Sequence, residues 1–206
     1  CRQQHGCSQL CKRKADKEKV NPYKVLDDLA SHVPPGSEDL IFIPHFGGRI
    51  YPCDPDMRGA WFGLNWKHKK PHLYRSVLES IAYEYRFYIS VLKELFPDLT
   101  FKEARVIGGG ARSDLWNQIK SDVLKIPYVR LNREEFGVLG LAIIAGYGVG
   151  LYRDMSETAK NFVKPVQVIK PRSEFSRKYE KYARLYLKLL QDLEDAFRVL
   201  AEPSRN

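Results

Sequence analysis

The chain has 206 residues, of which 44% are hydrophobic and 29% charged, and its formal net charge at pH 7 is +9. This length and composition are typical of a globular domain with a core of ordinary size, and they exclude a low-complexity or collagen-like chain. Lysine and arginine are interleaved with acids along the whole chain. That distribution favours a solvated basic surface and ranks a nucleic-acid-binding module low.

The first twenty residues differ from the rest. Residues 1–20 show almost no apolar periodicity, and we expect an atypical, poorly ordered N-terminal segment. Three of the four cysteines lie within the first eleven residues, without a C-x-x-C pair or a histidine pattern. This spacing argues against a zinc site, and no run resembles a secretory signal. We therefore predict a reduced, cytoplasmic protein that holds no metal through its own side chains.

Regular elements are predicted from residue 21 onward. Asn21 and Pro22 suit the N-cap and first position of a helix that reaches residue 33. Apolar residues recur with the helical period from 71 to 96, and Pro97 closes that helix. The other expected elements are strands at 40–46, 59–66, 103–107 and 128–131, and helices at 113–124, 136–147, 156–161 and 175–200. Strands followed by a β-α-β-α order predict an α/β domain, with a mixed sheet flanked by helices and a long C-terminal helix. One face of that last helix is a stripe of tyrosine and other apolar side chains, which we expect to be part of the core.

One uncharged stretch, 136–152, requires a test as a membrane span. A spanning helix needs about 20 apolar residues, and this stretch is shorter and rich in glycine. We expect a short buried helix there and no membrane segment.

The sequence "VIGGGARSDLWNQ" (106–118) places three glycines between an apolar strand and a helix. Such a turn can bring backbone close to a nucleotide, but it can equally be a tight turn without ligand. The dinucleotide-binding fingerprint fails here, because Ser113 stands where its third glycine belongs and Arg130 where its acidic residue belongs. From the triplet alone, both interpretations stay open.

Longer segments resemble a known family. Residues 106–129 are similar to the adenosine-binding segment of the FGGY carbohydrate kinases, and within them most similar to xylulokinase. Residues 59–79 match the second signature of that family in register, from Gly59 to Glu79. Residues 34–59 resemble the loop just upstream, and residues 134–154 resemble the helix at the domain interface.

The resemblance implies an actin-like ATPase (ribonuclease H-like) domain. Residues 21–200 would be the C-terminal nucleotide-binding domain of an FGGY-type sugar kinase, which transfers the γ-phosphoryl group of ATP to a sugar hydroxyl with Mg²⁺ on the phosphates. Asp114 would cap the following helix or contact adenosine, and Ser113 is a weaker candidate. Glycines on the interface helix, Gly137 and Gly140, would allow close helix packing. The residues implied to bind the nucleotide are Gly108, Gly109, Gly110, Ala111, Ser113 and Asp114.

In this family the first phosphate loop, most sugar contacts and the catalytic aspartate belong to an N-terminal domain, which would precede Cys1. We therefore expect no catalytic residue in this chain and no activity of the chain alone. A separately encoded N-terminal half and a homodimer are possible partners. The loop "FGGR" (46–49) differs from the "SGER" of xylulokinases, which leaves the sugar open. The alternative to a kinase half is a non-catalytic nucleotide-binding or regulatory domain that reuses this half of the fold.

Overall fold

The computed structural model describes residues 13–17, 19–133 and 135–201. The helices are α2 (Pro22–Ser31), α3 (Lys70–Leu95), α4 (Asp114–Leu124), α5 (Phe136–Gly148), α6 (Met155–Phe162), α7 (Ser173–Asp192) and α8 (Glu194–Ala201), and a 3₁₀ turn, η1, spans Gly109–Arg112. The strands are β1 (Ile41–Ile43), β2 (Ala60–Phe62), β3 (Ala104–Val106), β4 (Tyr128–Leu131) and β5 (Pro165–Ile169). Residues 13–17 are also helical, with Ala15 buried, whereas the rest of the expected atypical segment lies mostly outside the described residues.

The strands form two small sheets. β1 and β2 pair antiparallel, with Phe42 opposite Trp61. In the second sheet β4 lies between β3, its parallel neighbour, and β5, its antiparallel neighbour. This is the mixed sheet with flanking helices that the sequence predicts. The sequence does not predict β5, because its side chains are exposed except at Ile169.

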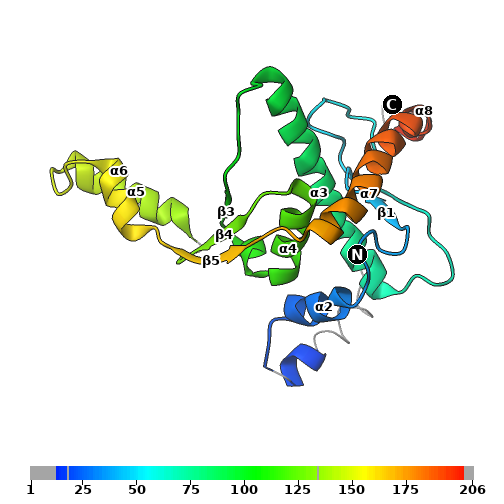
Figure 1. Cartoon of the computed structure of the whole chain (residues 1–206), viewed down its shortest axis with the longest axis horizontal. Helices are drawn as coiled ribbons and strands as arrows, with labels where there is room; N and C mark the ends of the chain where they lie inside the picture. The colour runs from blue at the N-terminus through cyan, green and yellow to red at the C-terminus, as the bar shows by residue number, and fades with distance from the viewer. Residues whose placement is uncertain (1–12, 18, 134, 202–206) are drawn as a thin grey trace.

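The core lies where α3, α4 and α7 meet over β1 (Figure 1). Tyr179 and Tyr186, from the stripe predicted as core, have exposed fractions of 0%. The predicted long C-terminal helix is two helices, α7 and α8, and Leu200 is exposed. The core residues are Ile41, Ile43, Met57, Leu78, Ala82, Tyr83, Ile119, Val123, Tyr179, Ala183, Tyr186, Leu189, Leu190 and Phe197.

The prediction of a buried helix at 136–147 is wrong for this chain. α5 and α6 lie together at one end of the molecule, away from the body formed by α3, α4 and α7 (Figure 1). Only Ile143 and Gly146 of α5 are buried. The apolar side chains that α5 leaves exposed include Val138, Leu141, Ile144 and Tyr147. No helix in the described part of the chain is both long and apolar enough to cross a membrane.

The close packing expected at Gly137 and Gly140 is also not observed. A Cβ placed on Gly137 or Gly140 would meet no atom within 4 Å, whereas one on Gly146 would collide with the ring of Tyr152. An all-apolar helix normally indicates burial. Here the composition indicates a surface that can be covered, but the described residues do not cover it.

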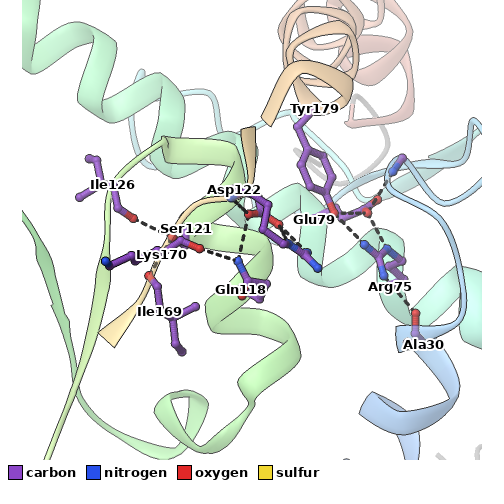
Figure 2. Close-up of polar contacts among 12 residues, drawn as sticks. Ala30, Arg75, Glu79, Gln118, Ser121, Asp122, Ile126, Ile169, Lys170 and Tyr179 are labelled. Carbon is purple, nitrogen blue, oxygen red and sulfur yellow. Dashed lines mark hydrogen bonds and ion pairs between the residues drawn. The ribbon is translucent and has the colours of Figure 1, made fainter. Parts of the chain in front are cut away.

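Two buried polar networks attach the C-terminal part of the chain to α3 and α4 (Figure 2). In the first, Glu79 accepts hydrogen bonds from Arg75 Nε at 2.8 Å and from the Tyr179 hydroxyl at 3.0 Å. In the second, the carboxylate of Asp122 on α4 accepts from the backbone N–H of Arg172 at 2.7 Å and from its guanidinium Nη2 at 2.6 Å. The start of α7 and a residue further along it are therefore each held by hydrogen bonds to a buried carboxylate.

Candidate functional site: a cavity at the glycine turn

The glycine turn opens on a cavity of about 1050 Å³. Its walls come from α2, the first turns of α3, η1 with the start of α4, and the start of α7. Among the residues that line the cavity are Lys24, Asp27, Asp28, Tyr74, Gly109, Gly110, Ser113, Asp114 and Trp116. A cavity of this volume lies at the upper end of the range of small-molecule and cofactor sites, roughly 300–1,000 Å³.

The turn itself is fixed by local hydrogen bonds. The side chain of Ser113 accepts from the backbone N–H of Trp116 at 2.9 Å and so caps α4. The buried amide of Asn117 donates to the carbonyl of Ala111 at 2.9 Å. Ser113 and Asn117 thus hold the 3₁₀ turn against the beginning of the helix, as N-capping predicts.

The three glycines serve different purposes. Gly108 has a φ of +77°, a left-handed conformation that residues with a Cβ rarely adopt. A Cβ on Gly109 would meet no atom of the chain within 4 Å, so the space beside this residue is open to the cavity. A Cβ on Gly110 would lie 2.6 Å from the ring of Trp116. The space beside Gly109 is therefore unfilled by the chain, whereas Gly110 makes room for Trp116.

The Trp116 ring packs against the glycine turn at Gly110. Its indole Nε1 donates to the carbonyl of Leu78 on α3 at 3.0 Å. The ammonium of Lys120 lies 4.1 Å from the centre of the Trp116 ring, and burial lowers the pKa of Lys120 to about 8. The ring is thus fixed from α3 and α4 together.

Four of the six predicted nucleotide-binding residues line this cavity, namely Gly109, Gly110, Ser113 and Asp114. Gly108 and Ala111 are not among its lining residues, and Ala111 is buried under the turn. Asp114 is not the helix cap, because Ser113 takes that place. The Asp114 carboxylate instead accepts a hydrogen bond from Arg130 on β4 at 2.7 Å.

The carboxylate of Asp27 on α2 also lines the cavity. Asp27 on α2 accepts a hydrogen bond from the Tyr74 hydroxyl at 2.9 Å. Burial raises the pKa of the Asp27 carboxyl, against hydrogen bonds from Ser113 and Tyr74 that lower it. Three elements distant in sequence therefore meet at one half-buried carboxylate.

Sequence reasoning missed Asp27, Tyr74 and the role of Trp116. Trp116 lies three residues after the cap, on the helix face that turns back over the glycines, and this spacing could have identified it. Asp27 and Tyr74 carry no local signal. Their relevance depends on how α2 and α3 pack beside the glycine turn.

The described residues do not themselves suit a divalent cation. No group of three or more histidine, cysteine, aspartate or glutamate side chains in this part of the chain could hold a metal ion. Any Mg²⁺ here would be held chiefly by other ligands, such as nucleotide phosphates.

Comparison with known proteins places this geometry in a family. The model of the FGGY family of carbohydrate kinases, C-terminal domain, matches residues 1–149. A gluconokinase of Bacillus licheniformis is 30% identical over 91% of this chain and 36% of its own length. A xylulose kinase of Staphylococcus epidermidis is 31% identical over 77% of this chain and 32% of its own. The chain thus spans about a third of these curated relatives.

Solved structures agree. Xylulose kinase from Lactobacillus acidophilus, solved with a ligand, superposes with a TM-score of 0.73 at 26% identity, covering 92% of this chain and 39% of that one. Gluconate kinase from the same organism gives 0.72 at 27% identity, covering 86% and 35%. Plasmodium falciparum glycerol kinase, solved with ADP, shares the fold with a TM-score of 0.69 at 20% identity, covering 90% and 36%.

The fold and the turn define a carbohydrate-kinase domain of the actin-like ATPase class. The chain belongs to the FGGY family of carbohydrate kinases, and its matched region is the C-terminal domain of that family.

Proposed function

We propose that this chain is the ATP-binding half of a cytoplasmic FGGY sugar kinase, and that adenosine occupies the cavity beside Gly109. The observation that carries the proposal is the open space at Gly109 in the wall of that cavity, in a family whose members are kinases. Backbone without a Cβ lets a flat base or a ribose approach closely. The Plasmodium falciparum glycerol kinase, which shares the fold, was solved with ADP, and this supports a nucleotide as the ligand class.

For the sugar, we propose a xylulokinase-like substrate, with gluconate as the second candidate. Relatives named xylulose kinase and gluconokinase match at nearly the same identity, 31% and 30%. Phosphoryl transfer requires a base that orients the nucleophile and groups that neutralise the phosphates on both sides. We propose that an N-terminal half supplies these, from the same or a separate polypeptide, and that this chain alone transfers no phosphate.

Isothermal titration calorimetry with ADP tests the proposal. We expect saturable binding with a Kd between about 10 µM and 1 mM, since only one side of a two-sided site is present. Xylulose and gluconate alone should give no saturable heat, and neither should be phosphorylated when ATP is added. Absence of ADP binding at millimolar concentration would contradict the proposal.

The same titration does not separate a kinase half from a regulatory nucleotide-binding domain. Addition of an FGGY N-terminal half does, because only a kinase half should then release ADP from ATP in the presence of sugar.

A further inference from the structure

The carboxylate of Asp27 presents hydrogen-bond acceptors to the same cavity that Gly109 opens. Asp27 lies on α2 and accepts a hydrogen bond from the Tyr74 hydroxyl on α3 at 2.9 Å, and the Ser113 hydroxyl at the start of α4 lies near enough to act against the burial that raises its pKa. All three side chains line the cavity. The cluster is therefore a fixed part of the wall, joined to the glycine turn through Ser113.

The direction of these hydrogen bonds determines what the wall can recognise. The Ser113 oxygen accepts from the N–H of Trp116, so its hydroxyl proton can be donated, and Asp27 is the acceptor whose pKa, raised by burial, it acts to lower. Tyr74 likewise donates its proton to Asp27. Both hydroxyl protons are thus committed, and the carboxylate keeps about two of its roughly four acceptor positions. The cluster can accept further hydrogen bonds but can offer none.

Among the described residues no salt bridge neutralises the charge of Asp27, although the nearby charge of Lys24 acts against the burial that raises the pKa of its carboxyl. Its neighbour Lys24 lies 4.0 Å from Asp28 instead, and none of the ion pairs formed by the described residues includes Asp27. A half-buried carboxylate with spare acceptor positions repels phosphate groups and attracts hydroxyl or amino groups. In an adenine nucleotide the amino group of the base carries one donor nitrogen and the ribose carries two adjacent hydroxyl donors, the better match to a carboxylate with two spare acceptor positions, whereas the phosphates carry acceptors only.

We propose that Asp27 is a positioning residue that accepts hydrogen bonds from the ribose hydroxyls and so orients the nucleoside against Gly109. This inference rests on the proposed function, since it requires a nucleotide in the cavity. It also sets the direction of the ligand, because the phosphates must extend away from α2.

Paired titrations test the inference. ADP and 2′,3′-dideoxy-ADP are titrated against the unaltered chain, against Asp27→Asn, and against Asp28→Asn as the matched control. The neighbouring Asp28 also lines the cavity but lies near Lys24, and it makes no contact with Tyr74 or Ser113 among the hydrogen bonds of the described residues. A charge-assisted hydrogen bond contributes about 1.5–3 kcal/mol. We therefore expect the unaltered chain and Asp28→Asn to bind ADP at least 10-fold more tightly than the dideoxy analogue, a ratio that falls toward 1 in Asp27→Asn.

The ratio compares two ligands on one protein, so partial unfolding of a variant does not change it. If the unaltered chain binds ADP but does not discriminate against the dideoxy analogue, the inference is wrong and the proposed function stands. The inference is also wrong if Asp27→Asn keeps the full discrimination. If the unaltered chain binds neither ligand, the proposed function fails, and the inference with it.

Discussion

Trp116 packs against Gly110 in the glycine turn and also contacts Lys120. The Trp116 ring occupies the space that a side chain at position 110 would need, and the Lys120 ammonium lies over that ring. A second ring, that of Tyr128 on β4, lies 5.4 Å from the same ammonium. Lys120 is only 6% exposed, so its charge is stabilised by aromatic faces and not by water.

Replacement of Lys120 by Met should stabilise the fold at neutral pH. Burial lowers the pKa of Lys120 from 10.5 to about 8, so the folded state disfavours the charged form. This cost is full below about pH 8 and vanishes above about pH 10.5. We expect Lys120→Met to raise the free energy of unfolding at pH 7 by about 1–3 kcal/mol, less whatever the cation–π contacts contribute.

Urea denaturation at pH 7 and pH 9.5 measures this effect, and the gain should be smaller at pH 9.5. Lys178→Met is the control, because Lys178 is exposed, pairs with the exposed Glu174 across one turn of α7 and lies 5.5 Å from the centre of the Phe175 ring. It should change the stability by no more than about 0.5 kcal/mol. A destabilised Lys120→Met at pH 7 would show that the aromatic contacts outweigh the burial of the charge.

At the scale of elements, α2, α3 and α7 are joined through Arg75. Its guanidinium donates to Glu79, to the carbonyl of Ala30 at 3.1 Å and to the Tyr179 hydroxyl at 2.8 Å (Figure 2). Burial raises the pKa of Glu79, although Arg75 and its hydrogen bonds lower it. The network fixes α2, and with it Asp27, relative to the glycine turn.

Loss of Arg75 should cost far more than loss of the Tyr179 hydroxyl. Arg75→Met leaves the Glu79 carboxylate buried without its cation, which costs about 3–5 kcal/mol. Tyr179→Phe removes one neutral hydroxyl and should cost about 1–2 kcal/mol. Denaturant unfolding of both variants checks the order, and Arg75→Met with Glu79→Leu should recover part of the loss. Equal costs for the two single variants would contradict an electrostatic role for the pair.

The elements that sequence predicts well have strong local signals. α2 begins at its Asn21 cap, α3 follows its periodic stripe, and β4 has the predicted bounds. β5 lacks such a signal, because it pairs with β4 while most of its side chains face solvent. The predicted burial of α5 is wrong because apolar composition says that a helix can be covered, not what covers it.

Some parts of the candidate site could likewise be predicted from local sequence signals, and others could not. Glycines between a strand and a helix mark the turn in the sequence, and Ser113 carries the signature of a cap. That Trp116 fills the space at Gly110 is a fact of packing. The cluster of Asp27, Tyr74 and Ser113 joins three separate helices, which no local pattern connects.

At the scale of the whole molecule, the cavity and the apolar helix lie in different parts of the chain. The cavity belongs to the body formed by α2, α3, α4 and α7, whereas α5 and α6 lie apart from it (Figure 1). The chain spans about a third of its curated relatives. The proposed nucleoside site beside Gly109 therefore lies in this body, and ADP binding at the site can be tested on this chain.

The most direct test follows backbone amide signals by NMR during an ADP titration of the unaltered chain, Gly109→Val and Gly140→Val. The Cβ of either new valine meets no atom within 4 Å, but only Gly109 lines the cavity. We predict that amides of residues 108–114 shift first, that Gly109→Val abolishes binding while its stability changes by less than about 1 kcal/mol, and that Gly140→Val binds normally. Normal ADP binding by Gly109→Val, or shifts confined to the basic residues 11–19, would contradict the assignment.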